Sequence, residues 1–196
     1  MVYYIAGYAL KIFLSIFGFL KVYQKENLPK EKGYVIACTH TGWVDILWLG
    51  VSILPTKVHY MAKKELFQTG FLKWLMESLN AFPVDRENPG PSSIKIPMRL
   101  IKEGKIVGIF PSGTRTSEDV PLKRGAVTIA SYAKAPIVPA AYVGPNNFKE
   151  LFKWQRPKII FGKPINLDRS LSKKEALQVM TDDLNEAMKK LQKQIK

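Results

Sequence analysis

Short apolar runs alternate with longer amphipathic segments along most of this chain. The runs have the length and composition of buried strands, and they lie at 34–38, 57–62, 81–86, 105–110, 136–143 and 158–161. The segments between them have helical length and lie at 43–54, 64–78, 92–103 and 126–134. A last helix begins at the capping box of Ser172 and Glu175 and keeps apolar residues three or four apart as far as Ile195. This alternation predicts an α/β fold, a single domain with a largely parallel central sheet flanked by helices.

Residues 1–22 are apolar and aromatic over a length that could cross a bilayer as a helix. At helical spacing, however, one narrow stripe carries Gly7, Lys11, Ser15 and Gly18, and a lysine near the middle of a membrane is costly. We therefore interpret the stretch as a helix lying in the membrane surface; a spanning helix and a core helix are the alternatives. On this interpretation residues 1–26 are an N-terminal membrane-associated helical segment and residues 27–196 are the folded domain.

The apolar face of one predicted helix and one of the two histidines are interpreted as structural rather than catalytic. The apolar side chains of the predicted helix 64–78 share one face, which we interpret as part of the core, with a wall beside an acyl chain or the bilayer as the alternative. They are Phe67, Phe71, Trp74 and Leu75. His59 alternates with Tyr60 along the predicted strand 57–62, so we interpret it as a packed strand residue rather than a catalytic one.

The chain is strongly basic. Lys and Arg number 30 against 16 for Asp and Glu, which gives a net charge of +14. This excess favours an anionic partner: a nucleic acid, an acidic membrane surface, or a phosphorylated substrate or carrier. Because the sequence has no nucleic-acid recognition motif, no nucleic-acid partner is expected. With a single cysteine, Cys38, and two histidines, neither an intramolecular disulfide nor a metal site is expected.

A candidate catalytic pair lies in the stretch 39–50, where the run 34–38 passes into the predicted helix 43–54. His40 lies in the turn and Asp45 in the first turn of the helix, so the carboxylate can reach back to the imidazole. A carboxylate on one ring nitrogen fixes the tautomer and raises the basicity of the other. The pair would be a general base without a nucleophile of its own, suited to a substrate hydroxyl. An Asp that only complements the helix dipole is the alternative.

Side chains suited to phosphate follow two further predicted strands. They are Arg86, Gly113, Thr114, Arg115 and Lys123. A glycine turn lets backbone amides approach an anion, threonine adds a hydroxyl donor, and arginine binds phosphate through two nitrogens. Ligands of open α/β sheets bind beyond the carboxyl ends of the strands. We therefore expect these residues to converge near His40 as a phosphate site.

Four stretches, in this order, resemble the four sequence blocks of the glycerolipid acyltransferases, and most closely those of the PlsC-type lysophosphatidic acid acyltransferases. They are His40-x-x-x-x-Asp45, Phe82-Pro83-Val84-Asp85-Arg86, Phe110-Pro111-Ser112-Gly113-Thr114-Arg115 and Ile137-Val138-Pro139. The ordered set is far more specific than any one block. The resemblance implies that residues 27–196 are a glycerolipid acyltransferase domain.

The resemblance also implies an activity: transfer of a fatty acyl group from an acyl thioester to the sn-2 hydroxyl of lysophosphatidic acid, which gives phosphatidic acid. His40 would be the base and Asp45 its orienter. Arg86, Arg115 and Lys123 would hold the phosphate at a turn shaped by Gly113 and Thr114. No cofactor is implied beyond the co-substrate, a thioester of coenzyme A or of acyl carrier protein. We expect an anionic membrane surface as partner, and a monotopic or peripheral location at the cytoplasmic face.

This chain departs from the family pattern at three positions. Ser112 stands where the third block commonly has Glu, and in the first block Thr39 replaces the usual Asn and Gly42 a frequent Ser. Within the enzymes, the alternative is an acyltransferase for another acceptor, such as glycerol 3-phosphate or another lysophospholipid. The alternative from another class is a non-catalytic basic protein that binds membrane surfaces.

Overall fold

The computed structural model describes residues 2–16, 19–30, 33–40, 42, 44–85, 88, 90–111, 124–153 and 156–196. Within these ranges the strands are β1 (Lys21–Tyr23), β2 (Tyr34–Cys38), β3 (Val58–Lys63), β4 (Ala81–Val84), β5 (Ile106–Ile109), β6 (Ile137–Val143) and β7 (Lys158–Phe161). The helices of the same residues are α1 (Val2–Ile16), α2 (Val44–Ser52), α3 (Gly70–Ser78), α4 (Ser92–Lys102), α5 (Gly125–Ala133), α6 (Phe148–Leu151) and α7 (Lys173–Ile195). Two short 3₁₀ helices are η1 (Lys25–Asn27) and η2 (Lys64–Phe67).

The strands form one sheet in the order β1-β7-β6-β2-β5-β3-β4. Every neighbouring pair is parallel except β6 and β7, which are antiparallel. The central strand, β2, is buried at each of its five residues, as expected of a parallel strand covered on both faces. The predicted α/β fold, a single domain with a largely parallel central sheet, is confirmed.

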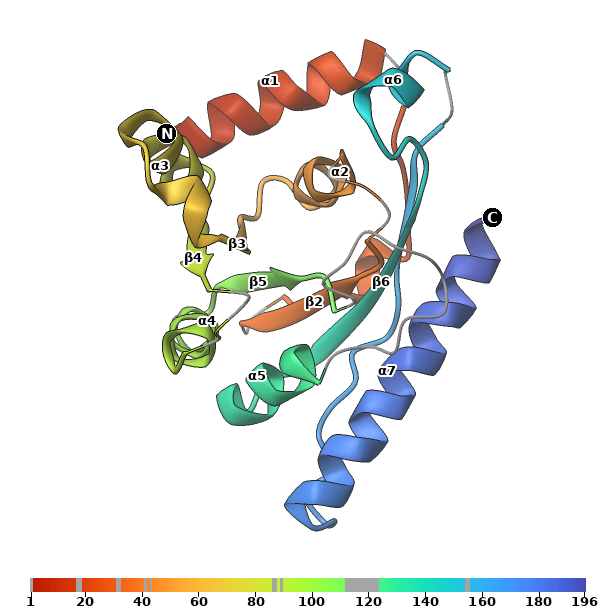
Figure 1. Ribbon diagram of the computed structural model, residues 1–196. Helices are drawn as coiled ribbons and strands as arrows, with labels where there is room; N and C mark the ends of the chain where they lie inside the picture. Colours follow the sequence, from red (N-terminus) through yellow and green to blue (C-terminus); the bar gives the residue numbers. More distant parts are fainter. Residues whose placement is uncertain are drawn as a thin grey trace.

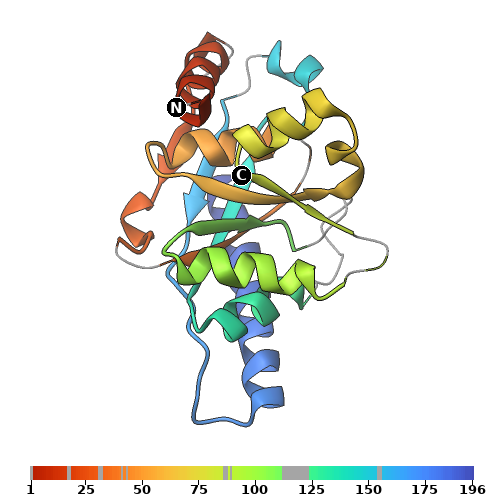
Figure 2. The ribbon, with the colours of Figure 1, turned by 90° about the vertical axis from the view of Figure 1, so that its left-hand side faces the viewer.

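Helices cover both faces of the sheet (Figures 1 and 2). On one face α1 and α2 enclose a core in which Leu14, Trp48 and Leu49 meet side chains of β2, β6 and β7. On the other face α4, α5 and α7 enclose a second core around Val35 and Ala37 of β2. Alternate residues of one strand therefore contribute to two different cores. The long helix α7 begins at the predicted capping box, with Ser172 and Glu175 exchanging both hydrogen bonds.

The chain between β3 and β4 differs from the prediction. The predicted helix 64–78 is divided into η2 and α3, and none of the nine residues of α3 is buried. Phe71 and Trp74 are 70% and 54% exposed. The interpretation of this apolar face as part of the core is therefore wrong. The physical reason is that α3 packs chiefly on η2 and on the edge strand β4, so the sheet offers it little surface to cover.

The N-terminal segment is helical and lies against the domain. In α1, Tyr3 and Leu14 face inward and are buried, whereas Ile5, Ile12 and Ile16 are exposed on the opposite side. Among the helices of the described residues, none combines the length and the apolar character needed to cross a membrane. β1, which the sequence pattern did not predict, follows α1 and pairs with β7. The division of the chain at residue 26 stays a prediction.

Candidate active site

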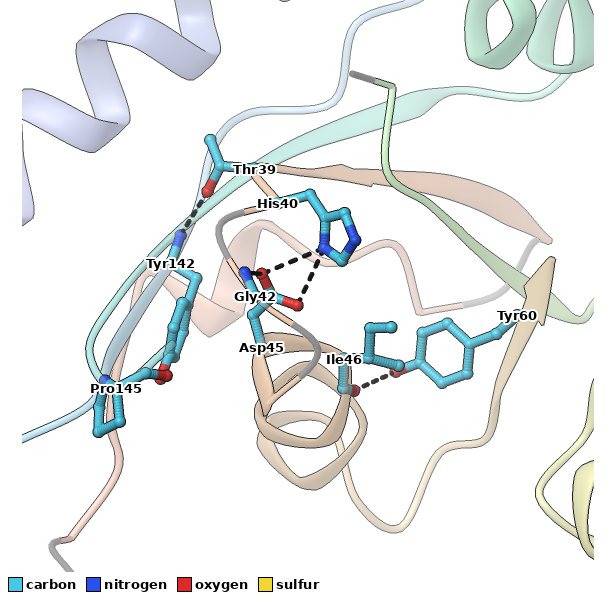
Figure 3. Close-up of polar contacts among 8 residues, drawn as sticks. All are labelled: Thr39, His40, Gly42, Asp45, Ile46, Tyr60, Tyr142 and Pro145. Atoms are coloured by element: carbon cyan, nitrogen blue, oxygen red, sulfur yellow. Dashed lines mark hydrogen bonds and ion pairs between the residues drawn. The ribbon is translucent and has the colours of Figure 1, made fainter. Parts of the chain in front are cut away.

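The pair of His40 and Asp45 lies where β2 ends and α2 begins (Figure 3). His40 Nδ1 is 3.1 Å from Asp45 Oδ1 and 3.2 Å from Oδ2. The backbone N–H of Gly42 donates to Oδ2 over 3.1 Å, and Asp45 is fully buried. The carboxylate therefore reaches back from the first helical turn to the imidazole, which is the contact that the spacing predicts.

These contacts fix the state of the imidazole. A buried carboxylate needs hydrogen-bond donors around it, and here the ring of His40 and the N–H of Gly42 supply them. The position of Asp45 in the first turn of α2 adds a favourable interaction with the helix dipole. An aspartate at Nδ1 holds the proton there and leaves the lone pair on Nε2. Nε2 is turned away from Asp45 in Figure 3, and no group of the described residues hydrogen-bonds to it.

Aromatic side chains from two neighbouring strands hold the ring of His40. Phe110, directly after β5, packs on the imidazole with the ring centroids 4.6 Å apart and a tilt of 37°. Phe110 also stacks on Tyr60 of β3, with centroids 6.4 Å apart. The Tyr60 hydroxyl donates to the carbonyl of Ile46 in α2 over 3.1 Å. The imidazole is thus held by Asp45 at one nitrogen and by packing on a face.

The turn before α2 is fastened on its other side to β6 and the loop that follows β6. The Thr39 hydroxyl accepts a hydrogen bond from the N–H of Tyr142 over 2.9 Å. The Tyr142 hydroxyl in turn donates to the carbonyl of Pro145 over 2.9 Å. A Cβ atom at Gly42 would lie only 1.9 Å from the carbonyl oxygen of Asn146. Glycine at this position therefore lets the loop approach the turn closely.

The thiol and hydroxyls around the pair stay protonated at neutral pH. Cys38 is fully buried at the end of β2, and burial, with a smaller effect of the Asp45 charge, raises the pKa of its thiol well above the usual range. Burial likewise raises the pKa of Tyr60 and of Tyr142. These groups are therefore poor nucleophiles. Of the groups around the pair, Nε2 of His40 is the one suited to accept a proton.

Comparison with known proteins shows to which family the chain belongs. A family model described as Acyltransferase matches residues 19–143. A protein of Bacillus subtilis named 1-acyl-sn-glycerol-3-phosphate acyltransferase is 61% identical over 189 residues, which are 95% of this chain and 95% of that protein. The chain belongs to the acyltransferase family. A protein of the same name from Streptococcus pneumoniae is 32% identical to this acyltransferase, over 98% of this chain and 74% of the relative.

A solved structure has the same fold as this acyltransferase. It is the crystal structure of the 1-acyl-sn-glycerophosphate (LPA) acyltransferase PlsC from Thermotoga maritima. The match has a TM-score of 0.69 at 20% sequence identity and covers 94% of this chain and 79% of the other. At this identity the likeness concerns the fold, and the PlsC-like architecture agrees with the predicted one.

The described residues include only part of the predicted site of this acyltransferase. The predicted phosphate residues lie outside them; these are Arg86, Gly113, Thr114, Arg115 and Lys123, and Ser112 lies there too. The flanking residues are described: Asp85 accepts a hydrogen bond from Lys64 Nζ over 2.5 Å and another from the N–H of Asn88. Since β2, β4 and β5 are parallel strands of one sheet, the segments after them leave at the same edge. Among the described residues, no cluster of three or more His, Cys, Asp or Glu side chains could hold a metal ion.

Two groups of supporting residues in this acyltransferase were missed by the sequence interpretation. One is the packing of Tyr60 and Phe110 behind His40, and the other is the hydrogen bond between Thr39 and Tyr142. One signal was available for the first group. Gly108 interrupts the apolar run of β5, and a Cβ atom there would lie 2.8 Å from the ring of Tyr60. A glycine inside a strand often marks such a close approach.

Proposed function

We propose that this acyltransferase transfers a fatty acyl group from an acyl thioester to the sn-2 hydroxyl of lysophosphatidic acid, giving phosphatidic acid. The observation that carries the proposal is the contact of His40 Nδ1 with the buried Asp45, with Nε2 left as the base. The names of the relatives that match nearly the whole chain support the choice of acceptor.

In the proposed reaction His40 Nε2 removes the proton from the sn-2 hydroxyl as the oxygen attacks the thioester carbonyl. The carbon–sulfur bond then breaks, and the leaving thiolate takes a proton back from the imidazolium. Asp45 stabilises the positive charge that His40 carries between these two steps. Positioned acid–base catalysis of this kind is worth about 10²–10⁴ in rate.

We assign the phosphate of the acceptor to Arg86, Arg115 and Lys123, at the turn of Gly113 and Thr114. The segments that carry these residues follow β4 and β5, which end at the same edge of the sheet as the strand before His40. The phosphate of lysophosphatidate is a few bonds from its free hydroxyl. Arginine bound to it through two nitrogens would therefore bind the acceptor and also set its hydroxyl against the imidazole.

We propose that the donor is acyl-CoA or acyl carrier protein and that no cofactor is needed. Both donors are anionic, and the net charge of +14 suits either of them as it suits an acidic membrane. The reaction needs only the thioester as co-substrate. The thiolate is a good leaving group, which favours acyl transfer, and His40 takes the proton from the hydroxyl and returns it to the thiolate.

We also propose that the protein lies on the cytoplasmic face of an anionic membrane, without crossing it. The support comes from α1, whose inner side is fixed to the domain while Ile5, Ile12 and Ile16 are exposed outward. The Tyr3 hydroxyl accepts a hydrogen bond from the N–H of Val58 over 3.1 Å, which helps to hold the helix flat. Tags at residues 1 and 196 should therefore label from the same side of the membrane; labelling from opposite sides would contradict this.

One assay tests the proposed activity. The purified protein is given labelled lysophosphatidate or labelled glycerol 3-phosphate, each with acyl-CoA and with acyl carrier protein thioester. We expect labelled phosphatidic acid from lysophosphatidate with at least one donor, and little product from glycerol 3-phosphate. Preferential acylation of glycerol 3-phosphate would contradict the proposal and identify glycerol 3-phosphate as the acceptor. Salt-dependent vesicle binding with no acyl transfer would instead identify a membrane-binding protein without catalysis.

A further inference from the structure

An exposed apolar surface on η2 and α3 has no role in the chemistry described above. We call it the α3 patch; its residues are Leu66, Phe71, Leu72 and Trp74, each between 38% and 70% exposed. The rings of Phe71 and Trp74 contact each other, with centroids 6.2 Å apart. Neighbouring apolar side chains of this size in water indicate a surface that meets another apolar phase.

The α3 patch is on the same side of the sheet as α1. Figure 1 places α3 near the beginning of α1 and away from α5 and α7, which cover the opposite face. The outer side of α1 is itself apolar, with Ile12 69% exposed. Two separate helices therefore expose apolar side chains on one side of the molecule.

The net charge of the chain, rather than the charges next to the α3 patch, favours an anionic partner. Lys63, Lys64, Lys73, Glu65 and Glu77 lie in β3, η2 and α3 and are all exposed, and Lys64 is paired with Asp85, so the charges near the patch balance. Two copies of a chain with a net charge of +14 would repel each other, which disfavours a second copy as the partner. A bilayer with acidic head groups offers both opposite charge and an apolar interior. Tryptophan is enriched at the interface between the head groups and the apolar interior.

We propose that the α3 patch is a second bilayer contact, which acts together with the outer side of α1. The proposal rests on the proposed function for its lipid partner, and it adds an orientation. A single helix would leave the protein free to tilt, whereas contacts at two helices fix it. η2 follows β3 directly, and β3 runs parallel to β2. The patch therefore begins at the carboxyl ends of the strands, where His40 lies. The orientation would bring this edge to the lipid surface.

Vesicle partitioning tests the proposal. The double variant Phe71→Gln/Trp74→Gln is compared with Tyr132→Gln/Val179→Gln, which removes two side chains of 44% and 43% exposure from α5 and α7 on the opposite face. The probe is sedimentation with vesicles of equal parts phosphatidylglycerol and phosphatidylcholine. We expect the first variant to partition at least about tenfold less and the control to match the unmodified protein. Equal partitioning of both variants overturns the proposal.

A second measurement needs no loss of the aromatic pair. An environment-sensitive fluorophore is attached to Phe71→Cys or to Tyr132→Cys; Cys38 is fully buried and is not labelled. Vesicles should shift the emission to the blue at residue 71 and leave it unchanged at residue 132. No shift at residue 71 overturns the proposal. So does a shift at residue 71 that grows with protein concentration without vesicles, because a second copy then covers the patch.

The same variants separate this proposal from the activity. Turnover is measured with a short-chain lysophosphatidate that is dispersed as monomers, so that no vesicle is needed. We expect the Phe71→Gln/Trp74→Gln protein to keep its turnover on this substrate while it loses vesicle binding. If no protein acylates the substrate but the double variant still loses binding, the patch stands and the activity fails. If both variants acylate it and bind equally, the activity stands and the patch fails.

Discussion

At the end of β2, each side chain has a separate part in presenting the Nε2 atom of His40. Asp45 holds the proton on Nδ1, and the ring of Phe110 packs on the imidazole. Thr39 fastens the turn to Tyr142 of the neighbouring strand. The lone pair therefore points in one direction before any substrate binds, which lowers the cost of bringing a hydroxyl into line.

Loss of either member of the pair should slow turnover strongly without unfolding the protein. We expect His40→Ala to lower kcat by about 10²–10⁴, because no base remains for the hydroxyl. Asp45→Asn should also be damaging, since an amide can donate to Nδ1 and favour the wrong tautomer. Steady-state kinetics on variants with native circular dichroism makes the measurement, and His59→Gln, at the other histidine, is the control. Near-normal turnover of folded His40→Ala would reject the mechanism.

Arg115→Lys tests whether Arg115, in the third sequence block, binds the acceptor or the acyl donor. Lysine keeps the charge but loses the two-nitrogen contact with phosphate. We expect use of the acceptor to weaken by about 1.5–3 kcal/mol, the value of a hydrogen bond to a charged group, while the KM of the donor barely moves. Each substrate is varied in turn in steady-state kinetics. A higher donor KM with unchanged acceptor KM and kcat would assign Arg115 to the thioester instead.

At the scale of elements, the strand-to-helix turn depends on a loop from elsewhere in the chain. The loop after β6 closes over Gly42, and Tyr142 connects the two through its backbone and its hydroxyl. This close contact accounts for the glycine at residue 42. A side chain at residue 42 would have to displace the carbonyl of Asn146.

Gly42→Ala should therefore destabilise the fold. The added Cβ meets a backbone atom that cannot rotate away, and overpacking of this kind costs about 1–3 kcal/mol. The free energy of unfolding is measured in urea. Gly70→Ala is the matched control, because nothing lies within 4 Å of a Cβ atom there and alanine favours the helix. A variant at residue 42 as stable as the control would show that the loop gives way easily.

The elements that the sequence predicted well are those whose pattern is local. The buried strand β2 is an uninterrupted apolar run, β6 is an apolar run with one proline, and β7 has three apolar residues after a lysine. The start of α7 is marked by its capping box. β1 was missed because three residues with exposed ends make no run. The contact of His40 with Asp45 followed from spacing along the chain. The packing of Phe110 and Tyr60 could not, because it depends on the order in which β2, β5 and β3 lie in the sheet.

At the scale of the whole molecule, His59 links stability to pH. It lies half-buried in β3, with Nδ1 3.2 Å from the carbonyl oxygen of Ile106. Burial lowers the pKa of its imidazole from the usual 6.5, an effect that the carbonyl of Ile106 opposes and that Lys105 and Lys57 reinforce. The unfolded chain therefore takes up a proton at a higher pH than the folded protein does.

The sign of this linkage gives a testable pH dependence. As pH falls below 6.5, the unfolded chain gains a proton first, so stability decreases until the pH reaches the lower pKa of the folded protein. His59→Gln removes this contribution, and its stability should decrease less steeply over the same range. Urea unfolding of both proteins at a series of pH values makes the comparison. Parallel curves below pH 6.5 would show that His59 does not contribute.

The pairing of β1 with β7 bears on how the protein assembles. Lys21 lies opposite Lys158, and Asn27, just after β1, donates a hydrogen bond to the carbonyl of Phe161. A contact between such distant parts of the chain forms slowly, because a long loop must close before it is gained. During synthesis on the ribosome, β1 has no partner strand until β7 has emerged. Completion of this edge of the sheet is therefore a late event in folding, and the chain between them must stay free of aggregation until then.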